Sequence, residues 1–390
     1  MTAGTLVIQK VRSLLMVLAS LIIGLLLSEG AVRMFWQNPY LDVKNSLKID
    51  FAFKRQYLPN KNLVFNISGL YEGAKKSLFR TGRQGEVLGK NQSRSPTVLF
   101  FGGSTTESRY VNEGSRWPEL VSGIRAVNVG YSGNGLGDSY NNLHYWLEYM
   151  DVAPEEVFIM HAVNDISLRA LYIEAYDSKS GIFDQNHWSM FRQRTDKPRE
   201  TLVVSPWVKR SSILALLFYS GQNWLAEESD LKVLSSYIKS AQRNRKEQSI
   251  SEQEFRLHYD KDITFALEAR EKVFSSMVLL AKSRGSKVTL LTQPHAYTSR
   301  YSHFTDEDIR EYPIYYGESP KNFTLQQTAY LMSKYNEQTR LMAVELGVEL
   351  IDLARGFELY PPGELLYDSI HMTDQGSKLA AKIINEHRKQ

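Results

Sequence analysis

The chain of 390 residues contains no cysteine, which excludes disulfide bonds, thiol catalysis and cysteine-ligated metal sites. It also lacks an excess of charge of one sign. There are 47 Lys and Arg residues against 43 Asp and Glu, and the basic residues are scattered along the chain. A nucleic-acid-binding surface needs a concentrated basic patch, so we expect no nucleic-acid partner.

Long hydrophobic runs are scarce, with one exception near the N-terminus. Residues 13–28 are almost wholly apolar and uncharged, and further apolar residues extend this run to residue 36. A membrane-spanning helix needs about 20 such residues. Lys10 and Arg12 precede the run and favour a cytoplasmic N-terminus. We interpret residues 1–36 as a cytoplasmic stub and a single transmembrane anchor. A cleaved signal peptide and a buried core helix are the alternatives.

Either an anchor or a signal peptide places residues 37–390 outside the cytoplasm. We therefore expect a single-pass protein of the inner membrane whose main domain lies in the periplasm or extracytoplasmic space. The sequence does not indicate an oligomeric state.

Short apolar runs alternate with helical patterns from residue 97 onward. The runs have the β-rich composition of buried parallel strands, and they cover residues 97–101, 126–129, 156–160, 287–292 and 348–353. The clearest helical patterns cover residues 264–283, 325–346 and 373–387. This alternation predicts an α/β fold, with a parallel sheet between helices on both faces.

After the stub and anchor, the chain is expected to divide into two regions, the second of which contains an insertion. Residues 37–95 are polar and form a lead-in or stalk with some strand content, and residues 96–390 form the main domain. Within that domain, residues 166–262 interrupt the alternation and are predicted to be a mostly helical insertion. The insertion either borders the functional site or forms a subdomain without a catalytic part.

A serine stands directly after the first predicted strand, in the segment Gly102-Gly103-Ser104. A residue in this place is exposed at the carboxyl edge of the sheet, where open α/β folds bind ligands. The glycines permit a tight turn, and a following helix offers its N-terminal amides to a negative charge. Such turns also bind phosphate or have no function.

A second candidate group is Asp368 with His371, in a loop before the last predicted helix. An aspartate can orient a histidine ring and stabilise the imidazolium that forms when a serine loses its proton. A structural role for both residues is the alternative.

Two further loops follow predicted strands and carry possible hydrogen-bond donors to an oxyanion. Asn164 can donate its side-chain amide, and Gly133 can donate its backbone N–H. Gly130 is a rival for the second role, because it lies in the same loop. Asn and Gly are also ordinary turn residues, so neither loop is informative alone.

Taken along the chain, the four loops carry Ser, Gly, Asn and Asp-x-x-His. This order resembles the SGNH hydrolase superfamily, also called the GDSL esterases and lipases, over residues 95–165 and 265–388. The resemblance implies a flavodoxin-like, three-layer sandwich with a central parallel sheet. It also implies cleavage of an ester through an acyl-enzyme, without a metal or an organic cofactor.

The resemblance further implies a role for each residue. Ser104 is the nucleophile, and its backbone N–H joins Gly133 and Asn164 in the oxyanion hole. His371 is the general base, and Asp368 orients it. We prefer Gly133 to its rival because the pattern Asn-x-x-x-Ser-Gly aligns it.

Two positions depart from the family's pattern. The aspartate that usually precedes the serine is Gly103 here, and a glycine two residues before Asn164 is Ala162. Neither departure removes a catalytic group.

The expected substrate is an ester-bearing small molecule or glycan, with an O-acyl (acetyl) group on a cell-surface polysaccharide as the first hypothesis. An O-acyltransferase that modifies such a polysaccharide would use the same triad. A lipase or thioesterase and a non-catalytic scaffold are the remaining alternatives.

One more histidine is a candidate for the site. His295 follows the predicted strand 287–292, at the same edge of the sheet, and we predict either a substrate contact or a structural role. No supporting pattern surrounds His144, His161 or His187.

Overall fold

The computed structural model describes most of the chain and divides it into two compact units. The described residues are 3–35, 49–51, 54–68, 70–89, 97–195, 251–297, 315–316, 319–360 and 362–389. The larger unit runs over residues 48–197 and 231–390, and it contains all the predicted site residues.

The smaller unit contains one long helix, α1 (Ala3–Phe35). Its segment Leu15–Val32 has a mean hydropathy of 2.2 and one charged residue, Glu29, and most of its side chains are exposed. By length and composition this helix is able to cross a membrane, and a signal sequence near an N-terminus has the same properties.

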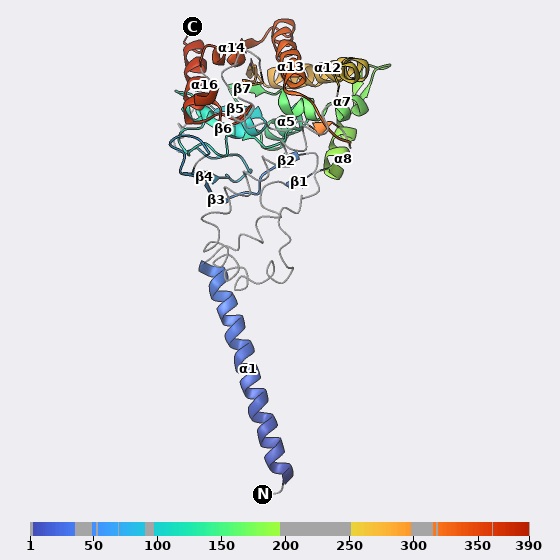
Figure 1. Cartoon of the computed structure of the whole chain (residues 1–390). Helices are drawn as coiled ribbons and strands as arrows, with labels where there is room; N and C mark the ends of the chain where they lie inside the picture. Colours follow the sequence, from blue (N-terminus) through green and yellow to red (C-terminus); the bar gives the residue numbers. More distant parts are fainter. Residues whose placement is uncertain are drawn as a thin grey trace. The chain divides into compact units, whose positions relative to one another are not determined.

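A five-stranded parallel sheet forms the centre of the larger unit (Figure 1). Its strands, in the order in which they lie side by side, are β13 (Glu349–Ile351), β10 (Lys287–Leu291), β7 (Glu156–Met160), β5 (Thr97–Gly102) and β6 (Arg125–Gly130). Among these five strands, β5 comes first along the chain, and it lies between β6 and β7, which come second and third. This 2-1-3-4-5 order is that of flavodoxin-like sheets, so the predicted fold class is confirmed.

Helices cover both faces of this sheet. On one face, Val98, Phe100 and Phe158 pack in a core with α4 (Trp117–Leu120), α14 (Leu353–Phe357) and α16 (Asp374–His387). On the other face, β5 contacts α5 (Leu136–His144), and β10 contacts α12 (Glu252–Ser283) and α13 (Leu325–Glu345). All strand residues of β5 and β7 except Thr97 are buried, as expected for a sheet covered on two sides.

The predicted strands and helices agree closely with the observed ones. The largest difference is α12, which begins at Glu252 rather than at residue 264. The final helix begins as expected, because the Thr373 hydroxyl accepts a hydrogen bond from the amide of Gly376 at 3.1 Å.

The described part of the lead-in belongs to the larger unit and packs against its α/β core. It contains β1 (Ile49–Phe51), β2 (Lys54–Gln56), β3 (Asn62–Asn66) and β4 (Lys76–Arg80), paired as two antiparallel hairpins. Tyr57 and Phe79 are completely buried. The amide of Val87 donates to the carbonyl of Asn128 on β6, which connects the lead-in to an edge of the sheet.

The described part of the insertion is helical, apart from the short hairpin of β8 (Tyr176–Asp177) and β9 (Ile182–Phe183). It contains the end of α6 (Val163–Ser167), the whole of α7 (Arg169–Ala175) and α8 (Gln185–Thr195), and the first turns of α12. Residues 196–250, with Trp207 and Trp224, lie outside the described residues.

A buried ion pair connects the end of β7 to α12. Asp165 and Arg270 have fully buried side chains and are 2.6 Å apart. The Arg270 guanidinium also donates to the carbonyl of His161 at 2.6 Å and to the side chain of Gln338 at 2.7 Å. Removal of one partner of such a pair leaves a charge buried without compensation.

We therefore expect Arg270→Met to reduce the free energy of unfolding by about 3–5 kcal/mol. Arg284→Met, which breaks an exposed ion pair with Glu148, should leave stability close to that of the wild type. Urea unfolding of the full chain in detergent measures both. Equal stabilities of the two variants would contradict the argument.

Candidate active site

A continuous chain of hydrogen bonds joins Ser104, His371 and Asp368. The Ser104 Oγ lies 2.7 Å from the His371 Nε2, and the His371 Nδ1 lies 2.6 Å from the Asp368 Oδ2. The Asp368 Oδ1 accepts the amides of Ile370 and His371, at 2.9 and 2.7 Å. The carboxylate thus fixes both the loop and the imidazole, so that the Nδ1–H points at Asp368 and the Nε2 faces the Ser104 hydroxyl, whose proton it can accept.

An aromatic ring supports the imidazole from the side. Tyr367 stacks on His371 with a centroid distance of 5.5 Å and an interplanar angle of 8°. Tyr71, from the lead-in, stacks on Tyr367 in turn at 5.8 Å, and its hydroxyl donates to Asp374 at 2.8 Å. The lead-in therefore takes part in holding the histidine loop.

Ser104 lies at the topological switch point of the sheet, directly after β5. It is the first residue of the short helix α3 (Ser104–Glu107), so its amide N–H has no partner within that helix. Gly103 permits a close approach of this turn to its neighbours. A Cβ at Gly103 would lie 2.1 Å from the Nδ2 of Asn164 and 3.3 Å from the carbonyl of Asn134.

The two predicted oxyanion loops meet at this point. Asn164, which follows β7, donates from its Nδ2 to the carbonyl of Asn134 at 2.9 Å, and the second proton of this amide remains available. Gly133 has a left-handed backbone with φ of 73°, which a glycine adopts without strain. Within the described residues, no acceptor pairs with the amide of Gly133 or with that of Ser104.

The rival Gly130 has a different role. Its amide donates to the side chain of Asn128 at 2.9 Å, and it is the last residue of β6. The geometry therefore favours Gly133 as the oxyanion donor.

His295 reaches the same edge of the sheet. The amide of its neighbour Ala296 donates to the carbonyl of Ser369, two residues before His371. Burial lowers the pKa of the His295 imidazole to about 4. A contact with substrate stays a prediction.

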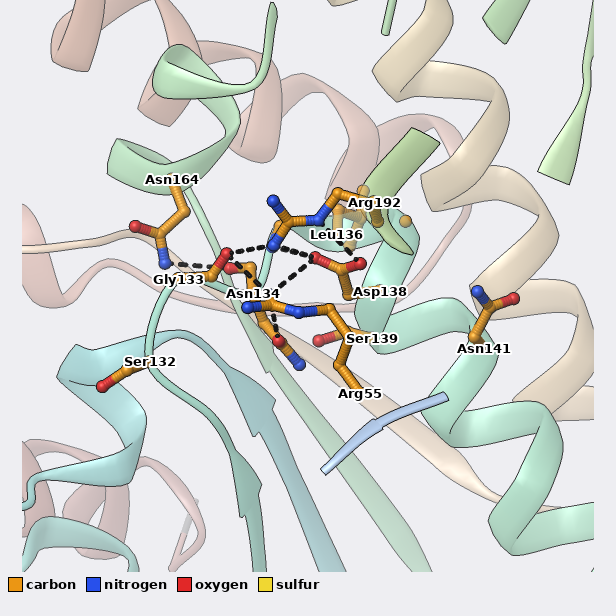
Figure 2. A network of polar contacts seen from close by, with 12 residues as sticks. Arg55, Ser132, Gly133, Asn134, Leu136, Asp138, Ser139, Asn141, Asn164 and Arg192 are labelled. Carbon is orange, nitrogen blue, oxygen red and sulfur yellow. Dashed lines mark hydrogen bonds and ion pairs between the residues drawn. The ribbon is translucent and has the colours of Figure 1, made fainter. Parts of the chain in front are cut away.

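Three residues near the site escaped the sequence analysis: Arg55, Asp138 and Arg192. They form a buried network beside Gly133 and Asn134 (Figure 2). None of the motifs in the sequence contains them, because the two arginines come from the lead-in and the insertion.

Comparisons with known proteins add a distant likeness. No protein-family model matches the chain, and no curated protein matches its sequence. Solved structures do resemble it. A lipolytic protein of the G-D-S-L family from Veillonella parvula is 14% identical, with 75% of this chain and 98% of that one covered and a TM-score of 0.39.

Two other structures are similar to the same extent. The acetyl xylan esterase AlAXEase is 15% identical, with 75% and 99% coverage and a TM-score of 0.38. A lipase/acylhydrolase from Enterococcus faecalis is 15% identical, with 76% and 96% coverage and a TM-score of 0.38. At these values the likeness carries no argument about function, and the functional assignment rests on the site itself.

A buried histidine beneath the site gives a pH-dependent contribution to stability. Burial lowers the pKa of His161 to about 4, and its Nε2 lies 2.8 Å from the Ser139 hydroxyl. The unfolded chain binds this proton near pH 6.5. Between pH 6.5 and about 4, the unfolded chain binds a proton at His161 and the folded chain does not. The free energy of unfolding is therefore fully retained above pH 6.5 and falls as the pH is lowered to about 4.

We expect His161→Gln to remove about 3 kcal/mol of the stability difference between pH 6.5 and pH 4. Urea unfolding at a series of pH values measures this difference. His295 contributes in the same window and remains in the variant. The exposed His144→Gln is the control and should keep the wild-type pH profile. An unchanged profile for His161→Gln would contradict the assignment.

Proposed function

We propose that the chain is a serine ester hydrolase of the SGNH type. The observation that carries this proposal is the hydrogen-bonded chain Ser104–His371–Asp368, with the side-chain amide of Asn164 beside the nucleophile turn. A serine, an imidazole and a carboxylate in this order form an activated nucleophile.

The first half of the reaction forms an acyl-enzyme. The Nε2 of His371 takes the proton of the Ser104 hydroxyl, and the Oγ attacks the ester carbonyl carbon. The resulting oxyanion is held by the amides of Ser104 and Gly133 and by the Nδ2 of Asn164. Each such donor lowers the barrier by about 3–4 kcal/mol. The tetrahedral intermediate then collapses to the acyl-enzyme, and the leaving alcohol takes the proton from His371.

The second half restores the enzyme. A water molecule then gives a proton to His371 and attacks the acyl carbonyl, which releases the carboxylic acid and the Ser104 hydroxyl. Asp368 stabilises the imidazolium in both halves without becoming protonated.

The proposed substrate is an O-acyl, first an O-acetyl, ester on a carbohydrate. Three half-buried tyrosines support this class, because aromatic rings with hydroxyl groups suit sugar rings. Tyr71 and Tyr110 contact Tyr367, which stacks on His371.

We also propose that α1 anchors the chain in a membrane, with the larger unit on the extracytoplasmic side. The apolar segment Leu15–Val32 supports this location.

A fluorophosphonate probe and an aryl acetate test the proposal. We expect the probe to label Ser104 in the folded full chain and to leave Ser104→Ala unlabelled, because only an activated serine attacks the phosphorus. Peptide mass spectrometry locates the adduct. An unlabelled wild-type serine would refute the proposal.

The time course with the aryl acetate separates hydrolysis from transfer. Steady turnover in water is expected for a hydrolase. An initial burst that resolves only after a glycan is added would instead show an acyltransferase, which uses the same triad on an alcohol acceptor.

The residue before the nucleophile, Gly103, stands where the GDSL family usually has an aspartate, and it gives a second test. We expect Gly103→Ala to reduce kcat for the aryl acetate by about 10²–10³-fold, because the added Cβ would displace the Asn164 donor. Gly356→Ala, whose Cβ meets only the flexible end of Ile383, is the matched control. Wild-type kcat in Gly103→Ala would show that Asn164 is not an oxyanion donor.

A further inference from the structure

The loop that carries Gly133 is held by two buried arginines from outside the α/β core. Arg55, in β2, donates to the carbonyl of Gly133 at 3.0 Å and to the side-chain oxygen of Asn134 at 2.8 Å. Arg192, in α8, donates to the same Gly133 carbonyl at 2.8 Å. Figure 2 shows the two guanidinium groups converging on this loop.

One carboxylate balances the two arginines. Asp138, in the first turn of α5, lies 3.4 Å from Arg55 and 3.2 Å from Arg192. It also accepts the indole N–H of Trp188 at 3.1 Å and the amide of Gly135 at 2.9 Å. Burial raises the pKa of this carboxyl, but the nearby arginines outweigh burial and hold the pKa below its usual value.

The network continues from this loop to the reacting centre. The carbonyl of Asn134 accepts the Nδ2 of Asn164, the same nitrogen that lies beside Gly103. Arg55 and Arg192 therefore fix one end of a chain of hydrogen bonds whose other end is an oxyanion donor. Hydrogen bonds from charged donors are about twice as strong as neutral ones, which suits them to hold a loop in one conformation.

We infer that Arg55 and Arg192 are positioning residues for the oxyanion hole. They hold the Gly133 carbonyl and the Asn134 side chain, and thereby fix the loop in which the Gly133 amide and the Asn164 side chain point at the developing negative charge. This inference rests on the proposed function. It makes the lead-in and the insertion parts of the active site's support.

A double-mutant cycle with Asn164→Ala tests the inference in the full-length protein. We expect Arg192→Met to reduce kcat for the aryl acetate by about 10–30-fold with KM within about twofold, less than the loss of a direct donor. In the Asn164→Ala background the same change should reduce kcat by less than about threefold, because residues that act as a unit are non-additive.

A merely structural role gives a different result. Partial unfolding lowers the active fraction equally in both backgrounds, so equal losses would overturn the inference. Arg192→Lys keeps the charge and should recover part of the activity. Arg55→Met, on a separate element, should repeat the non-additivity if Arg192→Met does not fold.

Arg340→Met is the matched control. It removes an arginine that pairs with Asp352 at 2.8 Å, away from the oxyanion loops, and should leave kcat at the wild-type value. Wild-type kcat in both Arg192→Met and Arg55→Met would overturn the inference alone. An absence of turnover and labelling in the wild type would overturn the proposed function, and the inference with it.

Discussion

The neutralisation of two buried carboxylates supports the whole site. Asp138 and Asp165 both bind the start of α5, through the amides of Gly135 and Leu136 at 2.9 and 2.8 Å. A carboxylate in the interior is stable only when it is paired and hydrogen-bonded. The arginines that pair with these groups come from three separate parts of the chain. The position of α5, and of the oxyanion loop before it, therefore depends on long-range electrostatics.

The sheet provides the second constraint. Its order places the carboxyl ends of β5, β6 and β7 next to one another, and each of these ends leads into one loop of the site. The fourth loop arrives from the other end of the chain, just before α16. A parallel sheet thus supplies positions, and buried ion pairs supply orientation. Neither alone would bring the donor groups to within hydrogen-bonding distance of a common point.

The sequence predicted the sheet well, and the structure brings the three residues of the predicted triad within hydrogen-bonding distance. All five strands were recognisable because buried parallel strands are continuous apolar runs, and glycine or polar residues end them. Ser104, His371 and Asp368 were placed by their positions after strands and before the last helix. The sequence pattern already favoured Gly133 over Gly130, and the bond from the amide of Gly130 to Asn128 agrees with that preference.

The supporting residues were not predictable for a physical reason. Arg55 and Arg192 act through contacts with residues 78 and 59 positions away, and an arginine in a polar segment normally lies on the surface. The lead-in has the composition of a stalk, yet Tyr57 is fully buried. The local sequence pattern therefore identifies the residues that are suited to react. Only the fold identifies the residues proposed to position them.

The bond between Ser104 and His371 joins residues 267 positions apart. A contact this distant in sequence forms late, because the loop that it closes costs entropy until other contacts offset it. Along the chain, Ser104 is synthesised 267 residues before His371. Until His371 has been made and folded into place, Ser104 has no imidazole partner. Under the proposed function, the long separation between the two residues therefore delays activation of the serine until the loop before α16 has folded.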